Sequence, residues 1–109
     1  MSNAQDRTKS IRARHTALRA EYGSLYDDVL GILMKHDPID IVEVPDEYEP
    51  EVGTILPRLK RAKSAADVRR IIHEEFVQWF SLGLAGPEKN FQQISIEVWS
   101  AWSRHLNRP

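Results

Sequence analysis

The sequence predicts an all-α fold: one compact bundle of about four helices, with a long N-terminal helix followed by an acidic, proline-rich loop. Apolar residues recur at spacings of three and four through most of the chain, which is the period of an amphipathic helix. Prolines and glycines near residues 38–50 and 83–87 separate these runs. We expect residues 1–5 to be a disordered tail or cloning remnant, and residues 6–109 to form a single helical domain.

The first helix should begin near Asp6 or Thr8 and end at about His36. Its apolar spacing continues across Gly23, so one helix is expected rather than two, and a bend at Gly23 is the alternative. A helix of nearly thirty residues is about 45 Å long, whereas a domain of this size is about 26 Å across. The N-terminal half should therefore protrude, or pack on a second molecule and drive self-association.

The segment from His36 to Val52 carries seven carboxylates and three prolines but no Lys or Arg. Pro38 disfavours helical geometry at Asp37 and so ends the first helix. A short extended piece is expected at Ile39 to Val44, where apolar residues alternate with acids. Carboxylates can ligate a hard cation, but this spacing does not match a calcium-binding loop. We expect a solvated loop near a basic helix face of the same molecule, with a charged partner as the alternative.

The second helix should start at Pro50, because proline suits a first helical turn. It should bend at Pro57, whose ring crowds the carbonyl of Gly53. The third helix should start at Ser64, which forms a capping-box-like pair with Asp67.

The third helix is expected to end at Gly83, and the fourth to run from Pro87 until it frays near Leu106. The residues expected to be buried in these two helices are Val68, Ile71, Ile72, Phe76, Trp79, Phe80, Phe91, Ile94, Val98, Ala101 and Trp102.

Composition excludes several classes of function. The chain has no cysteine, which excludes disulfides, thiolate zinc sites and cysteine nucleophiles and fits a reducing, cytoplasmic location. No apolar run approaches the roughly 20 residues that span a bilayer, so no membrane partner is expected. The net charge of −1 favours neither membrane nor nucleic acid, and the bases of the first helix are spread around it. Nucleic-acid binding is therefore not expected.

No catalytic signature is recognisable, so we expect no catalytic residue, no cofactor and no metal site. The favoured function is a non-enzymatic protein-binding module, adaptor or immunity-like. The alternative is a metal-dependent hydrolase, because carboxylates are the ligands that divalent metal ions prefer. Its candidate residues are Asp27, Asp28, Glu74 and Glu75, or the His36-Asp37 pair.

Three tryptophans lie in the last two predicted helices, at Trp79, Trp99 and Trp102. Aromatic residues at helical spacing are mostly core. One that is exposed next to Arg104 would anchor a protein partner. We therefore name Trp99 and Trp102 as candidate binding residues.

Asp37-Pro38-Ile39 after an amphipathic helix, followed by Asp46-Glu47-Tyr48, resembles the YugE-like family of small bacterial all-helical proteins over roughly residues 24–82. That family has no established activity, so the resemblance implies only a compact helical domain. It also implies that five residues act together, as a structural clasp or as a binding site: Asp37, Pro38, Asp46, Glu47 and Tyr48. A tyrosine hydroxyl and carboxylates can bond the open amides and carbonyls of two helix ends, which favours the clasp.

Overall fold

The structure is a computed structural model that describes residue 13 and residues 16–38 and 48–107. All regular structure in these ranges is helical, which confirms the all-α prediction. Residues 16–22 are helical and precede the labelled elements. The elements are α2 (Ser24–His36), α3 (Glu49–Ile55), the 3-10 helix η1 (Leu56–Arg61), α4 (Ala65–Phe80), α5 (Leu82–Ala85), the 3-10 helix η2 (Glu88–Phe91) and α6 (Gln92–Leu106).

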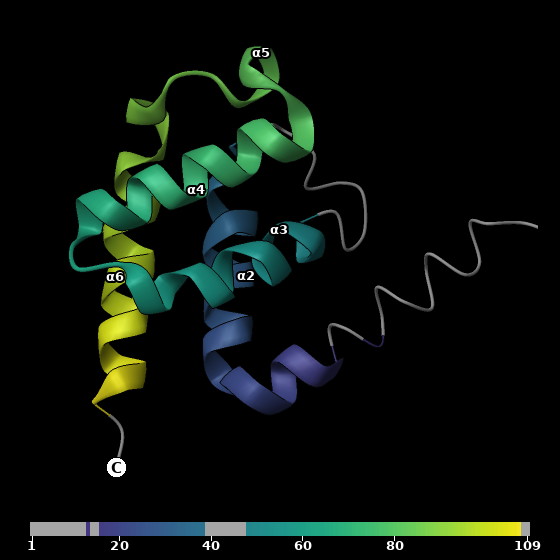
Figure 1. The fold of residues 1–109 in the computed structure, drawn as a ribbon, viewed down its shortest axis with the longest axis vertical. Coiled ribbons are helices and arrows are strands. Elements are labelled where there is room, and N and C mark those ends of the chain that lie inside the picture. The colour runs from purple at the N-terminus through teal and green to yellow at the C-terminus, as the bar shows by residue number, and fades with distance from the viewer. Residues whose placement is uncertain (1–12, 14–15, 39–47, 108–109) are drawn as a thin grey trace, which may run out of the picture.

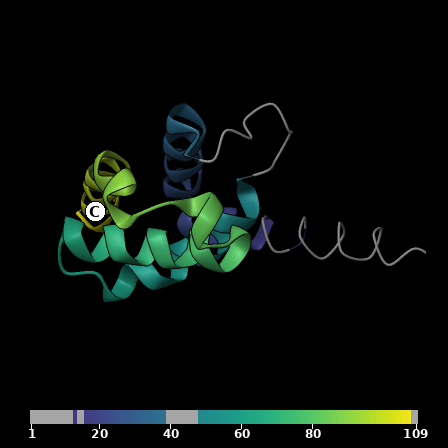
Figure 2. The same cartoon turned by 90° about the horizontal axis from the view of Figure 1, so that it is seen from above.

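The helices form two crossing layers. α2 and α6 lie side by side and run antiparallel (Figure 1). α4 and the α3–η1 segment form the second layer and cross the first pair, as Figure 2 shows from above. The core lies between the layers, and its largest fully buried aromatic side chains are Tyr26, Tyr48, Phe76 and Phe91.

The prediction of one long N-terminal helix is wrong within the described residues. Gly23 takes φ +60° and ψ −135°, and this backbone conformation ends the first helix. The Gly23 N–H still donates to the Arg19 carbonyl at 2.8 Å. α2 then starts in a new direction (Figure 1). Glycine permits this turn because a positive φ costs it little. The expected start of the first helix, residues 1–5 and the extended piece at 39–44 lie outside the described residues.

The turn at Gly23 lets the first helix contribute to the protein's own core. Leu18 and Tyr22 are 7% and 4% exposed and pack in the same cluster as α2. Apolar side chains on both sides of Gly23 are therefore buried together, so the periodicity continues across the break.

The predicted second helix is present, and it changes type near Pro57. The α-helix ends at Ile55 and continues as the 3-10 helix η1 from Leu56. A proline has no N–H to donate and its ring crowds the preceding turn. The expected bend therefore takes the form of a change in hydrogen-bond pattern. This is one reason why more elements are present than the four expected.

α4 begins as predicted but ends earlier. The Ser64 hydroxyl accepts the Asp67 N–H at 3.2 Å, and Asp67 Oδ2 accepts the Lys63 N–H at 2.8 Å. The helix ends at Phe80 rather than Gly83, because Ser81 leaves helical geometry at φ 118° and ψ 161°. The residues after it form α5, a separate single turn.

Candidate functional site

Asp37 and Tyr48, two of the five residues of the predicted clasp, are in contact through their side chains. Asp37 follows α2 in the left-handed conformation (φ 45°, ψ 58°), and its N–H donates to the Leu33 carbonyl at 2.8 Å. The Tyr48 hydroxyl, at the start of α3, donates to Asp37 Oδ1 at 2.5 Å. Tyr48 is 2% exposed and its ring packs against Phe76. These contacts fix the end of α2 to the start of α3.

The rest of the predicted loop site is less closely defined. Pro38 is half-buried beside Asp37, while Asp46 and Glu47 lie outside the described residues. Because Tyr48 is buried and bonded to Asp37, both side chains are used in packing. A role for these five residues in binding a ligand stays a prediction.

Acidic and basic segments of the chain meet where the first helix passes α3. Arg19 lies 3.4 Å from Glu49 Oε1 and 4.8 Å from the centre of the Tyr26 ring. The Tyr26 hydroxyl donates to the same Glu49 oxygen at 3.2 Å. Burial, together with the Glu49 carboxylate, raises the pKa of Tyr26. This is one contact of the kind expected between the acidic segment and a basic helix, and the acids at residues 40–47 lie outside the described residues.

A second polar cluster joins the two helices of the α2–α6 layer around Glu97. Lys35 pairs with Glu97 Oε1, and His36 Nε2 lies 2.6 Å from Oε2. Gln93 donates to the same carboxylate at 3.2 Å. The hydrogen bonds from Lys35 and then His36 lower the pKa of Glu97 to about 2. His36 therefore faces a carboxylate of α6 instead of forming a pair with Asp37.

The surface beside this cluster is a shallow groove of about 300 Å³ between the same two helices. Its lining residues are Asp28, Ile32, Glu97, Ser100 and Arg104. The groove contains acidic and basic groups, but Glu97 is already held by Lys35 and His36. We assign no chemistry to it.

The carboxylates of the hydrolase hypothesis do not form one cluster. Glu74 and Glu75 both bind Arg58, at 2.6 and 3.0 Å. Asp27 lies 3.6 Å from Arg19, and Asp28 lines the α2–α6 groove. Over residues 16–38 and 48–107, no three His, Cys, Asp or Glu side chains lie close enough to hold a metal ion.

The exposed tryptophan is not one of the two that were named as candidate binding residues. Trp102 is 5% exposed, belongs to the core and stacks on His105 with ring centres 5.7 Å apart. Trp99 is half-buried against the same core. Trp79, expected in the buried stripe of α4, is 46% exposed, and its Nε1 donates to Thr54 Oγ1 at 3.0 Å. It follows Phe76 of the buried row by three residues, and nearly half of its surface is exposed.

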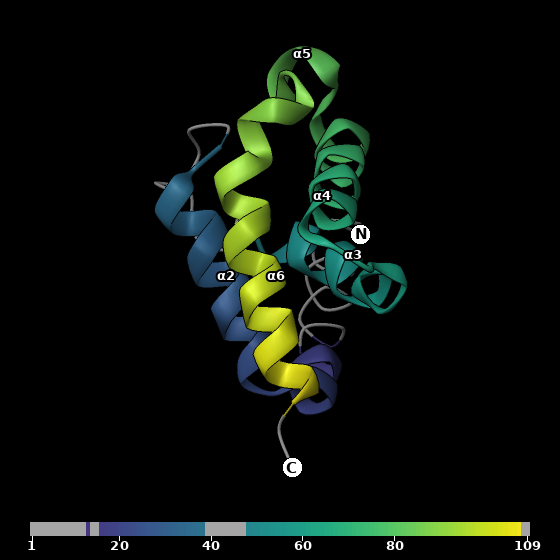
Figure 3. The same cartoon turned by 90° about the vertical axis from the view of Figure 1, so that its left-hand side faces the viewer.

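The end of α4 and the following turn present a set of exposed apolar side chains. Leu82 and Leu84 of α5 are 62% and 63% exposed, and Trp79 precedes them by three and five residues in the chain. We call Trp79, Leu82 and Leu84 the apolar corner. It holds three of the six large apolar side chains that are exposed in the described part of the chain. Figure 3 shows α5 at the end of the molecule farthest from the C-terminus.

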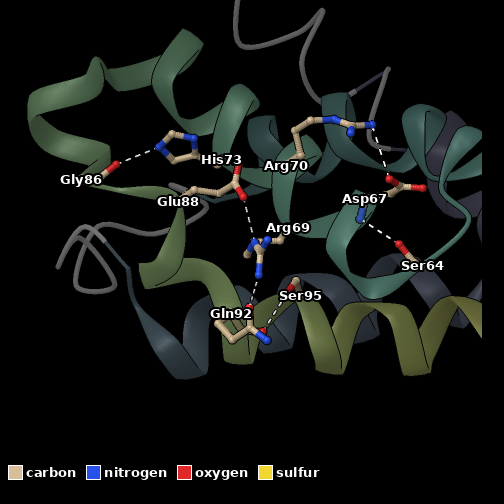
Figure 4. A network of polar contacts seen from close by, with 9 residues as sticks. All are labelled: Ser64, Asp67, Arg69, Arg70, His73, Gly86, Glu88, Gln92 and Ser95. Atoms are coloured by element: carbon tan, nitrogen blue, oxygen red, sulfur yellow. Dashed lines mark hydrogen bonds and ion pairs between the residues drawn. The ribbon is translucent and has the colours of Figure 1, made fainter.

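Polar contacts hold the chain on both sides of the corner in place. The Ser81 hydroxyl accepts the Leu84 N–H at 3.3 Å, which caps α5. His73 Nε2 lies 2.8 Å from the Gly86 carbonyl (Figure 4). From the same face of α4, Arg69 donates to Glu88 Oε2 at 2.9 Å and also pairs with Gln92. The exposed leucines therefore sit on a fixed turn.

Sequence reasoning missed the apolar corner because four residues are too few to show a helical period. The available signal was that Leu82 and Leu84 fall outside every buried stripe. None of the described helices has the length and apolar character needed to cross a bilayer. Comparison of the chain with protein-family models, curated proteins and solved structures found no match.

Proposed function

We propose that this chain is a non-enzymatic protein-binding module, adaptor or immunity-like, that docks through the apolar corner. The observation that supports this most directly is the exposure of Trp79, Leu82 and Leu84, between 46% and 63%, within one short stretch. Large apolar groups that stay in contact with water cost free energy in the isolated protein. Grouped apolar side chains on a surface mark interaction sites.

The backbone at the corner supports a functional reason for this exposure. Ser81 holds φ at 118°, a conformation that costs a non-glycine residue on the order of 1–3 kcal/mol. Ala85, at the other end of the turn, is 2% exposed and ties α5 to the core. The strained turn therefore buries a small residue while two leucines face solvent.

The proposed partner is a protein with an apolar groove that covers exposed side chains of the corner. Tryptophan is among the commonest hot-spot residues at protein interfaces. The Trp79 Nε1–H already bonds to Thr54, so its apolar edge can be covered without leaving a donor unpaired. This arrangement suits a side chain that acts as a rigid anchor.

The test uses a Leu82→Ser/Leu84→Ser variant, with Met34→Ser/Ile96→Ser as the matched control. The control residues are 45% and 43% exposed and lie on α2 and α6, away from the corner. Partners are captured by cross-linking in the source cells, purified and titrated by calorimetry. We expect the corner variant to bind about tenfold to thirtyfold more weakly, and the control to bind like the wild type.

Sedimentation equilibrium separates a second copy from a different partner. A concentration-dependent dimer that is lost only in the corner variant identifies the partner as a second copy. Equal affinity of both variants for the captured partner would contradict docking through the corner. A wild-type chain that stays monomeric and captures nothing would contradict the protein-binding function itself.

Three further statements belong to the same proposal. Membership of a YugE-like family is compatible with a binding role, since that resemblance brings no activity with it. Self-association through the first helix would have to use surface other than Leu18 and Tyr22, which are buried. We place the protein in the cytoplasm on the basis of its cysteine-free sequence.

A further inference from the structure

The first helix and the end of α6 lie at the opposite end of the molecule from α5 (Figure 3). Residues of these two segments line a pocket of about 440 Å³. Three segments that are distant in sequence form it: the end of the first helix, η1 with the residue after it, and the end of α6. Its lining residues are Glu21, Tyr22, Lys60, Ala62, Trp102, His105 and Leu106. The volume falls within the range of about 300–1,000 Å³ that is typical of small-molecule sites.

One wall of this aromatic pocket is a row of rings. Tyr22 and His105 lie with their ring centres 6.4 Å apart, and His105 stacks on Trp102 at 5.7 Å with an angle of 24°. Tyr22 and Trp102 are anchored in the core, being 4% and 5% exposed. Aromatic rings prefer offset or edge-to-face contacts with other rings, so this row favours a ligand that carries an aromatic ring.

The rim of the pocket carries one charge of each sign. Lys60 Nζ and Glu21 Oε1 are 3.7 Å apart, and both side chains are more than half exposed. An exposed ion pair of this kind contributes little to stability, so a ligand can separate the two groups at low cost. Lys60 also lies 5.9 Å from the centre of the Tyr22 ring, which places its ammonium group beside the aromatic wall.

This charge arrangement selects among aromatic ligands. A ligand with only a positive charge could pair with Glu21 but not with Lys60, and one with only a negative charge could pair with Lys60 but not with Glu21. A ligand with adjacent positive and negative groups can satisfy both residues. The head group of a free amino acid has this composition.

We propose that the aromatic pocket binds a free aromatic amino acid. Lys60 donates to the ligand carboxylate, Glu21 accepts from the ligand ammonium group, and the ligand ring contacts His105 and the small exposed parts of Tyr22 and Trp102. The site shares no residue with the apolar corner, so the two proposals can fail separately.

The test titrates L-phenylalanine into the full chain and follows backbone amide chemical shifts by NMR. Three comparison ligands each lack part of the head group. Phenethylamine has no carboxylate, 3-phenylpropionate has no ammonium group, and N-acetylphenylalaninamide has neither charge. We expect L-phenylalanine to shift amides around the pocket. Each singly charged analogue should bind about two- to fivefold more weakly, the amount that an exposed ion pair provides.

Two exposed-residue variants assign the head-group contacts. Lys60→Gln should remove the preference for phenylalanine over phenethylamine, and Glu21→Gln should remove the preference over 3-phenylpropionate. The Leu82→Ser/Leu84→Ser variant should bind phenylalanine like the wild type. Equal binding of all four ligands, including the one that mimics an aromatic residue within a protein, would overturn the proposal. Absence of binding up to the solubility limit of phenylalanine, or preferences unchanged in both variants, would also overturn it.

Discussion

The end of α2 and the apolar corner differ in how their side chains are used. At the end of α2, Asp37 accepts a hydrogen bond from the Tyr48 hydroxyl. Lys35 and His36, in the last turn of α2, pair with Glu97 of α6. At the corner, polar contacts hold the backbone while Leu82 and Leu84 face solvent. The first arrangement contributes to stability, whereas the second leaves apolar surface for another molecule. Under the proposed function, folding and binding would use different regions of the molecule.

The largest expected effect compares two aromatic residues on α4. Phe76 is fully buried and contacts the rings of Tyr48, Phe80 and Phe91, so Phe76→Ala should lower the free energy of unfolding by about 3–5 kcal/mol. Trp79→Ala removes a half-buried side chain and one hydrogen bond, so it should lower the free energy of unfolding by about 1–2 kcal/mol. Urea denaturation of both variants measures the difference. Equal losses would mean that Trp79 is a core residue.

The next effect tests the clasp at the end of α2. Tyr48→Phe removes the hydroxyl that donates to Asp37, and a hydrogen bond to a charged group contributes about 1.5–3 kcal/mol. Tyr26→Phe is the comparison, since its hydroxyl donates to Glu49 over a longer 3.2 Å. We expect the smaller loss there. If Tyr48→Phe unfolds at the wild-type urea midpoint, the contact with Asp37 does not hold the two helix ends.

Two glycines test the break before α2. A Cβ added at Gly23 or at Gly31 would have no neighbouring group within 4 Å. The two positions differ in backbone conformation, because Gly23 has φ +60°. Gly31→Ala should stabilise the helix by about 0.5–1 kcal/mol. Gly23→Ala should destabilise the protein by about 1–3 kcal/mol, because φ +60° with ψ −135° is a strained backbone conformation for a residue with a Cβ. Stabilisation by both substitutions would instead support one continuous N-terminal helix.

A smaller effect tests the Glu97 cluster. Because folding lowers the pKa of Glu97 to about 2, the folded state favours the ionised carboxylate. The stability it adds is fully present above the unfolded pKa of about 4.5 and is lost as the pH falls to about 2. Glu97→Gln should lower the free energy of unfolding at neutral pH by up to about 1 kcal/mol. The same substitution should also make the free energy of unfolding depend less on pH over that acid range. An unchanged acid profile in the variant would exclude Glu97 as its source.

Sequence reasoning succeeded where the signal was local. Ser64 caps α4 through the spacing that defines a capping box, and Pro38 lies two residues after His36, the last residue of α2. The buried stripe of α6, from Ile94 to Trp102, follows directly from its helical period. In each case the determining contacts lie within one turn or one helix.

It failed where the outcome depended on distant parts of the chain. The break at Gly23 was given only as the alternative to one continuous helix, because the apolar spacing continues across it: Tyr22 and Leu25, on either side, are buried in the same core. The exposure of Trp79 depends on where α3 lies, and α5 is too short to show periodicity. The aromatic pocket joins Tyr22, Lys60 and Trp102, whose proximity no spacing along the chain indicates.

The central claim is that the exposed leucines of the apolar corner do not hold the fold together. The most direct measurement is the free energy of unfolding of the Leu82→Ser/Leu84→Ser variant by urea denaturation. We predict a value within about 0.5 kcal/mol of the wild type, as for surface substitutions outside the packed core. A loss of more than about 1.5 kcal/mol, in the range of a buried leucine, would show that these side chains are structural and would contradict the account.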